Sequence, residues 1–298
     1  MASSTRVSEV IVGLKQRVPW PAKLAAKIIL SRLPVPYGIW KALAAFEHGH
    51  MDRPEYALGS FERHWKRAHF EGKKLGGFVA LELGPGDSLF SALIASAFGA
   101  SKTYLVDVGP FAGGDLKSYR GMAQLLESRG FSLPGFASAR TLEELLTSCS
   151  AVYLTHGLSS LRQIPYSSVD FVWSHAVLEH VRRDDFAPLL HELRRVQKPA
   201  GASSHTVDLK DHLGGALNNL RFAHTLWESD FMAKSGFYTN RIRYTEMIDL
   251  FCKAGFQPHV LDVDRWPELP TPRKGLAKPF SALPHEELVV SGFDVLLH

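Results

Sequence analysis

The stretch of sequence that decides the fold is FVALELGPGDS, residues 78–88. Its first six residues are mostly apolar, and two glycines, Gly84 and Gly86, follow them. A short apolar run that ends in a glycine turn is typical of a buried strand in a parallel sheet. Residues 88–98 have small and apolar side chains and end before Gly99, which predicts a helix. The turn between strand and helix can approach a ligand closely, and the first N–H groups of the helix face that ligand.

Strands and helices alternate along most of the remaining chain. Further strands are predicted over residues 103–108, 151–154, 170–174, 201–209, 258–263 and 288–297, and helices over 141–148, 185–196 and 246–254. This alternation predicts an α/β fold, a doubly wound, Rossmann-like parallel sheet of about seven strands with helices on both faces. In such a sheet the connections are right-handed, and a ligand binds outside the carboxyl ends of the strands.

Two segments lie outside this alternation. Residues 1–75 are broken by prolines and predict an N-terminal helical extension, with helix-like spacing over 23–33 and 56–69. Residues 212–240 fit no element of the sheet. We therefore expect an extension over residues 1–75 and an α/β domain over 76–298, with residues 213–243 inserted as a lid over the mouth of the active site.

Asp107 is the first candidate for a ligand-binding side chain. It lies near the end of the second predicted strand, 23 residues after Gly84. A carboxylate at this position can accept hydrogen bonds from both hydroxyls of a ribose. The dinucleotide fingerprint needs a third glycine where Leu89 stands, and the chain has no Gly-Lys-Ser/Thr phosphate loop. The pattern therefore favours a nucleoside without a pyrophosphate over NAD or ATP, and Leu89 argues against a dehydrogenase.

Three segments, in the expected order, resemble class I S-adenosylmethionine-dependent methyltransferases of type 11. The glycine turn resembles their motif I in its acid-x-Gly-x-Gly form. Residues 169–181, VDFVWSHAVLEHV, resemble the fourth-strand motif, and residues 193–201, LRRVQKPAG, resemble the helix and turn that enter strand five. The last segment departs from the usual Lys-Pro-Gly-Gly at Ala200. The resemblance extends over residues 78–209 and implies S-adenosylmethionine as the methyl donor and residues 76–298 as the methyltransferase domain.

The resemblance also implies which residues bind the cofactor. Glu82 and the turn would face the methionine part, Asp107 would hold the ribose, and the loop after the third strand would lie near the adenine. Ser174 and His175 would lie beside the sulfonium. The full set of expected cofactor residues is Glu82, Gly84, Pro85, Gly86, Asp87, Ser88, Asp107, His156, Gly157, Leu158, Ser174 and His175.

A cluster of polar residues follows the fifth predicted strand, where the substrate is expected. Together with His175, it gives the catalytic candidates His175, His205, Asp208, Asp211 and His212. Because strand residues alternate between faces, His205 and Val207 are expected on one face and Asp208 on the other. Three interpretations stay open. One histidine is a general base oriented by an aspartate, the cluster binds a divalent cation, or it is a hydrogen-bonded turn without chemistry.

The acceptor is the least determined part of the sequence. Aromatic and arginine side chains in residues 213–243 either stack on a ring and pair with an anion, or form the insertion's own core. We expect O-methylation of a small-molecule, sugar or lipid-linked acceptor, since a hydroxyl acceptor makes use of a general base. The alternatives are methylation at nitrogen or carbon, or a catalytically silent subunit that binds S-adenosylmethionine and regulates a partner.

Composition and charge limit the remaining classes. The 298 residues are 45% hydrophobic and 21% charged, as in globular proteins, and Cys149 and Cys252 match no metal-ligand spacing. No apolar run approaches the roughly 20 residues that span a bilayer, so a cytoplasmic protein is expected. Residues 1–45 contain a single acid and seven basic residues, Arg6, Lys15, Arg17, Lys23, Lys27, Arg32 and Lys41. This segment either contacts an anionic membrane or acidic substrate, or is a solvated helix face. No nucleic-acid substrate is expected, because the segment after strand four lacks an Asn-Pro-Pro-Tyr-like motif.

Overall fold

The computed structural model describes residues 19–30, 32, 50–70, 76–133 and 136–298. Four of the basic residues expected to make the N-terminal segment cationic, Arg6, Lys15, Arg17 and Lys41, lie outside the described residues. The interpretation of that segment as a membrane or substrate contact therefore stays a prediction.

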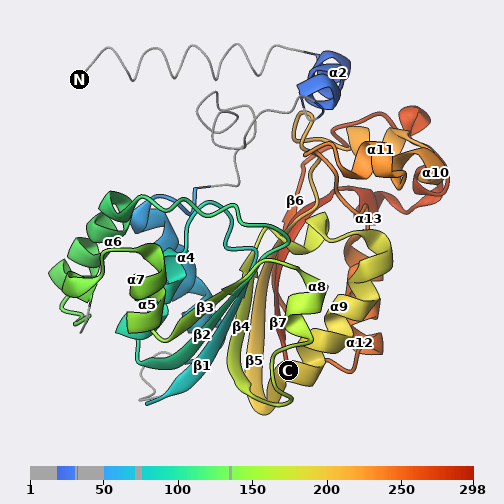
Figure 1. The fold of residues 1–298 in the computed structure, drawn as a ribbon. Coiled ribbons are helices and arrows are strands. Elements are labelled where there is room, and N and C mark those ends of the chain that lie inside the picture. The colour runs from blue at the N-terminus through green and yellow to red at the C-terminus, as the bar shows by residue number, and fades with distance from the viewer. Residues whose placement is uncertain (1–18, 31, 33–49, 71–75, 134–135) are drawn as a thin grey trace.

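The centre of the molecule is one seven-stranded sheet (Figure 1). The strands are β1 (Phe78–Leu83), β2 (Ala100–Val106), β3 (Ala151–Leu154), β4 (Val169–His175), β5 (Gln197–Asp208), β6 (Pro258–Arg265) and β7 (Val290–Leu297). They lie in the order β3-β2-β1-β4-β5-β7-β6, so the chain reverses direction across the sheet after β3. The predicted doubly wound sheet of about seven strands is confirmed. A ligand site is therefore expected where the order reverses, between the carboxyl ends of β1, β2 and β4.

One strand departs from the expected parallel sheet. β7 runs antiparallel to both β5 and β6, between which it lies. The reason is the connection, because residues 266–289 contain only the short elements η4 (Arg273–Gly275), η5 (Phe280–Ala282) and α13 (His285–Leu288). The chain stays at the end of the sheet where β6 finishes, and β7 must run back from that end.

Helices cover both faces of the sheet, as predicted (Figure 1). One face packs against α4 (Pro54–Arg67), α5 (Phe90–Ala97), α6 (Leu116–Ser128) and α7 (Leu142–Ser148). The other packs against α8 (Leu158–Leu161), α9 (Arg183–Val196) and α12 (Tyr244–Lys253). Helix α7 begins with a side-chain cap, since Glu144 N–H donates to Thr141 Oγ1 over 3.1 Å. No helix was predicted over residues 116–128, although Tyr119, Met122 and Leu126 form a buried stripe at helical spacing.

Helix α4, from the segment predicted as an extension, contributes directly to the core. Its Phe61 is fully buried and its ring lies 5.0 Å from that of Phe98 and 5.9 Å from that of Trp173 on β4. A helix with so large a buried aromatic contact is held by hydrophobic packing on the sheet. The first residues of α4 are therefore fixed above the carboxyl ends of β1 and β4.

The segment between β5 and α12 forms a separate small layer at the upper end of the sheet (Figure 1). It contains η3 (Asn218–Arg221), α10 (His224–Trp227) and α11 (Asp230–Ala233), and α2 (Trp20–Leu30) packs on it through Trp20, Leu24 and Ile28. Trp227, Phe237 and Tyr238 are buried in its own core. Of the two interpretations of these aromatic residues, the structure therefore supports packing. Whether residues 213–243 act as a lid stays a prediction.

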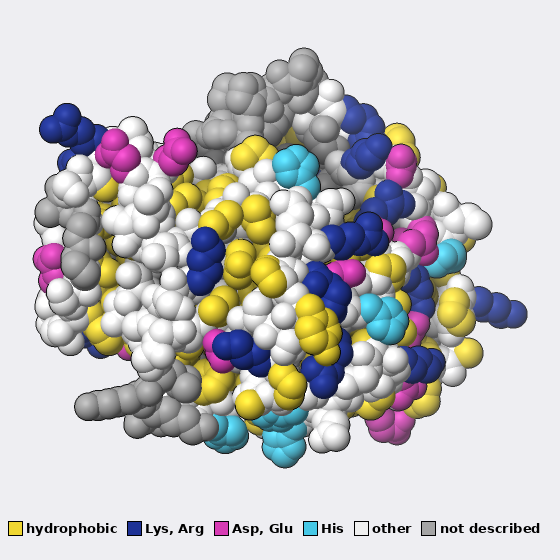
Figure 2. Space-filling model, turned by 60° about the horizontal axis from the view of Figure 1, so that its bottom comes forward, with side chains coloured by type: hydrophobic (Ala, Val, Ile, Leu, Met, Phe, Trp, Pro, Cys, Tyr) yellow, Lys and Arg dark blue, Asp and Glu magenta, His cyan; other side chains and the backbone are white. Residues whose placement is uncertain are grey.

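The molecular surface carries its charge unevenly. On the face drawn in Figure 2, Lys and Arg side chains gather on the half where α9 and α12 lie. Helix α9 carries basic residues at both ends, Arg183 in its first turn and Arg194 and Arg195 in its last. Among the described residues, no helix is long and apolar enough to cross a bilayer.

Candidate functional site

The glycine turn after β1 has the tight geometry that its sequence predicts. Gly84 and Gly86 have φ angles of +64° and +67°, in the left-handed region that favours glycine. A Cβ atom on Gly84 would lie 2.6 Å from Val177 Cγ2, so no larger residue fits there without a shift. Val177 follows β4, and the turn is therefore packed against the loop that leaves the neighbouring strand.

The carboxylate of Asp107 lies in direct contact with this turn. Gly86 N–H donates to Asp107 Oδ2 over 3.1 Å, and Val108 N–H donates to Oδ1 over 2.7 Å. The backbone is fixed as well, because Asp107 N–H donates to the carbonyl of Leu154 and its own carbonyl accepts from Gly157 N–H. Asp107 thus joins the turn after β1 to the loop after β3.

Glu82 is a buried acid beside the same turn. Among the described residues, no donor reaches its Oε2 atom, although the side chain is only 2% exposed. Burial raises the pKa of Glu82 to about 8, a hydrogen bond from Ser91 opposes the shift, and the charge of Asp107 adds to it. A buried carboxyl with an unfilled acceptor position fits a ligand that brings a cation or a strong donor. The ammonium group of a methionine moiety is such a ligand group, so these residues fit S-adenosylmethionine.

The other turn residues shape the site from within. Pro85, Asp87 and Ser88 are buried. The Ser88 hydroxyl donates to the carbonyl of Met51, and the Asp87 carbonyl accepts from Gly113 N–H over 3.0 Å. These bonds fix the segment before α4 and the loop after β2 against the turn.

The loop after β3 lies next to Asp107. Gly157 has a φ of +51°, His156 N–H donates to Ser160 Oγ, and Leu158 begins α8. Sequence analysis missed one neighbour, Val108, whose side chain is 78% exposed although it directly follows the fixed Asp107. An apolar surface beside this carboxylate is suited to a planar ring. The signal was present in the sequence, as an apolar residue immediately after the acid.

His175 at the end of β4 has a partner that sequence analysis did not identify. Its Nε2 lies 3.0 Å from the hydroxyl of Tyr56 on α4, 119 residues earlier in the chain. Within the part of the chain that the structure describes, its buried Nδ1 has no hydrogen-bond partner. Burial lowers the pKa of His175, which keeps the imidazole neutral at physiological pH. No spacing rule connects these two residues, because only the packing of α4 on the sheet brings them together.

His205 is not placed with His175. Its Nδ1 lies 2.7 Å from Ser174 Oγ, and like Val207 it faces the α9 side of the sheet, whereas His175 faces α4. The predicted alternation of β5 is therefore confirmed. His205 is fully buried, and burial lowers its pKa to about 3. It is a neutral histidine inside the sheet packing, bonded to Ser174.

The remaining candidates after β5 form a turn. The Asp211 carboxylate accepts the N–H groups of Leu213, Gly214, Gly215 and Asn218. Asp208 accepts from Lys210 N–H and lies 3.2 Å from the Lys210 ammonium, while the ring of His212 packs on that of His180. Across the described ranges, no group of three or more His, Cys, Asp or Glu is placed to hold a metal ion. Of the three interpretations of this cluster, the geometry of Asp211 matches the hydrogen-bonded turn.

Comparison with known proteins gives the following similarities. Residues 137–204 match the family model described as a methyltransferase domain. No curated protein shows significant sequence similarity to the chain. A solved S-adenosylmethionine-dependent methyltransferase from Mesorhizobium loti is 16% identical, with 78% of this chain and 96% of that chain covered and a TM-score of 0.42. A second, from Archaeoglobus fulgidus, is 12% identical, with coverages of 82% and 92% and a TM-score of 0.42. A phosphoethanolamine N-methyltransferase from Haemonchus contortus is 15% identical, with coverages of 80% and 51% and a TM-score of 0.43.

The contact between Gly84 and Val177 can be tested by a double-mutant cycle. Gly84→Ala is expected to lower the free energy of unfolding by about 2–4 kcal/mol, from the left-handed φ and the collision with Val177. In a Val177→Ala background the two Cγ atoms are absent and the remaining Cβ lies 3.3 Å from the added Cβ, so the same change should cost about 1–2 kcal/mol, mainly the backbone term. Urea denaturation gives the free energy of unfolding of the wild-type protein, the two single variants and the double variant.

Gly130 provides the matched control for this cycle. It also has a positive φ, +85°, but an added Cβ would meet nothing within 4 Å. Gly130→Ala should therefore cost about 1–2 kcal/mol and show no coupling to Val177→Ala. Additive effects of Gly84→Ala and Val177→Ala would contradict the packing of the turn described above.

Proposed function

Given that this chain is a class I S-adenosylmethionine-dependent methyltransferase, we propose that it transfers the methyl group to a hydroxyl oxygen of a small-molecule, sugar or lipid-linked acceptor. The observation that carries the proposal is the direct contact between the Asp107 carboxylate and Gly86 N–H at the switch point of the sheet. This contact places a carboxylate that can bind hydroxyl groups next to a glycine turn whose backbone a ligand can approach closely. Binding of a nucleoside requires both.

Each part of the cofactor has a proposed set of partners at this edge of the sheet. Asp107 binds the ribose hydroxyls, and Glu82 binds the ammonium of the methionine part. Val108 and the loop His156–Leu158 surround the adenine, and His175 lies beside the sulfonium. The buried, unfilled Oε2 of Glu82 and the exposed side chain of Val108 support these assignments.

S-adenosylmethionine supplies a methyl group already activated on a sulfonium. The chain's residues therefore mainly align the acceptor and exclude water. His175 is the proposed general base, because its neutral imidazole can accept the proton that a hydroxyl acceptor loses. The hydrogen bond to Tyr56 fixes its ring and connects it to α4, whose N-terminal part is tied to the glycine turn through Met51 and Ser88.

The insertion is the proposed cover of this site. Asn240 N–H donates to the carbonyl of Glu179, and its side chain donates to the carbonyls of Leu178 and Val181. These bonds fix the end of residues 213–243 to the loop after β4. This loop begins directly after His175, the last residue of β4. Lys27 of α2 donates to the carbonyl of His212, so α2 closes the same layer from outside.

Calorimetry with S-adenosylhomocysteine tests the cofactor assignment. Asp107→Ala is expected to weaken binding about a hundredfold, since it removes charge-assisted hydrogen bonds to two hydroxyls. Asp185→Ala, which removes an exposed carboxylate in the first turn of α9, should leave the affinity unchanged. Equal affinities of the wild-type and Asp107→Ala proteins would rule out the ribose assignment.

A pH profile tests the acceptor assignment. A labelled methyl donor, incubated with metabolite and glycan extracts, identifies an acceptor for kinetic work. His175→Ala should then slow transfer about a hundredfold and Tyr56→Phe about tenfold, with unchanged affinity for S-adenosylhomocysteine. Because the pKa of His175 is lowered, its protonated and inactive form appears only below pH 6.5. We therefore expect kcat/KM to stay constant from neutral pH to pH 6.5 and to decrease at lower pH.

Two results would contradict the proposal of O-methylation. Full activity of His175→Ala would indicate an acceptor that needs no such base, as expected for nitrogen or carbon methylation. Binding of the cofactor without transfer to any acceptor would favour a silent regulatory subunit.

A further inference from the structure

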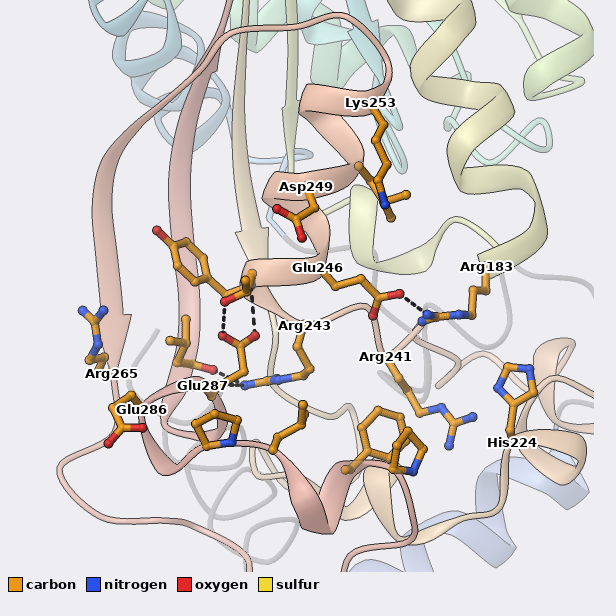
Figure 3. A pocket seen from close by; sticks show the side chains of 18 residues that line it. Arg183, His224, Arg241, Arg243, Glu246, Asp249, Lys253, Arg265, Glu286 and Glu287 are labelled. Carbon is orange, nitrogen blue, oxygen red and sulfur yellow. Dashed lines mark hydrogen bonds and ion pairs between the residues drawn. The ribbon is translucent and has the colours of Figure 1, made fainter.

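A cavity of about 880 Å³ lies between α12, α13, η5 and the insertion (Figure 3). None of the residues proposed to bind S-adenosylmethionine lines it, nor does any of the catalytic candidates. The loop Leu178–Val181 lies between β4 and the insertion, and Asn240 of the insertion donates hydrogen bonds to it. The cavity is therefore distinct from the proposed methyl-transfer site, and nothing in the proposed reaction uses it.

Two arginines form the charged end of this cavity. Figure 3 shows the guanidinium groups of Arg183 and Arg241 at the same end, with Arg183 paired to Glu246. Burial lowers the pKa of Arg241, the charge of Glu228 opposes this, and the charge of Arg183 lowers it further, so the two arginines are close enough to repel. Two neighbouring cations in a partly buried place are a binding site for an anion.

Arg241 pairs with Glu228 but keeps one donor that the residues around it leave unsatisfied. Its side chain is only 1% exposed, and its carboxylate partner Glu228 lies at 3.4 Å and also accepts the hydroxyl of Tyr238. A further donor goes to the carbonyl of Phe222. Among the described residues, no acceptor reaches Arg241 Nε. A buried guanidinium in a cavity wall with an unfilled donor is the polar group that a ligand would satisfy.

The rest of the cavity supplies apolar surface. Leu250, Pro279, Phe280, Leu283 and Pro284 line it, and the Arg241 guanidinium lies 5.1 Å from the centre of the Phe280 ring. Of the acids in the lining, Glu246 lies at the arginine end, where it pairs with Arg183, and the others lie away from Arg241. Glu287 accepts from Thr245 at the start of α12, and Asp249 and Glu286 are exposed to solvent.

We propose that this cavity binds an organic anion with an apolar body, its carboxylate or phosphate head at Arg183 and Arg241 and its body along Phe280 and Leu283. Cations at one end and an apolar wall beside them match such an amphipathic molecule better than a free inorganic anion or a neutral lipid. The site is occupied independently of the methyl donor, because the two share no residues.

Isothermal titration with four probes tests the chemistry of the ligand. Decanoate and decyl phosphate should bind, and their ratio tells a carboxylate head from a phosphate head. Decanol, which lacks the charge, and inorganic phosphate, which lacks the apolar body, should each bind at least tenfold more weakly. Decanol binding as tightly as decanoate would overturn the proposal.

Variants of the full chain locate the site. Arg183→Gln changes a partly exposed side chain, so the fold should persist, and decanoate binding should weaken about tenfold. Arg241→Gln should weaken it by a similar factor. Arg129→Gln, an exposed arginine after α6 on the opposite face of the sheet, is the matched control and should bind as the wild-type protein does.

Saturating S-adenosylhomocysteine separates this proposal from the proposed function. Decanoate affinity should not change when it is present, and Asp107→Ala should bind decanoate normally even though it loses the nucleoside. Displacement of decanoate by S-adenosylhomocysteine, or wild-type decanoate affinity in Arg183→Gln, would show that the anion binds elsewhere.

Discussion

The structure of the site depends on one hydrogen-bonded contact, between the Asp107 carboxylate and Gly86 N–H. It joins the turn after β1 to the end of β2, and the bond from Gly157 N–H to the Asp107 carbonyl extends the connection to the loop after β3. A carboxylate is costly to bury unless donors satisfy it, so its position is set by the surrounding backbone N–H groups. Those same donors fix the carboxylate at the switch point of the sheet, where binding of a nucleoside is proposed.

Around this contact the fold adds parts from distant segments of the chain. Helix α4 is held on the sheet by aromatic packing at Phe61, and this packing brings Tyr56 to His175. The insertion is held at its end by Asn240, next to the loop after β4. The buried ionisable groups differ in their partners: the Asp107 carboxylate accepts backbone N–H groups, whereas Glu82 and Arg241 each keep an unfilled position. The two unfilled positions face different ligands, a cationic group at Glu82 and an anion at Arg241.

Much of the fold could be predicted from local patterns. The run that forms β1 and the helix predicted over 141–148 are where the sequence places them, because a buried strand and a helix start are specified by adjacent residues. The spacing of Gly84 and Asp107 likewise predicted that turn and carboxylate meet. The antiparallel direction of β7 could not be read locally, since it depends on where a 24-residue connection lies. The pairing of Tyr56 with His175, and the separation of His205 from His175, depend on packing and on strand faces that only the assembled sheet fixes.

A crystal structure of the protein with S-adenosylhomocysteine would test the central claim most directly. The account predicts both ribose hydroxyls within hydrogen-bond distance of the Asp107 carboxylate, and the amino group of the homocysteine part at Glu82. Density for the nucleoside at any other place, such as the cavity beside α12, with no ribose hydroxyl within hydrogen-bond distance of Asp107, would contradict it.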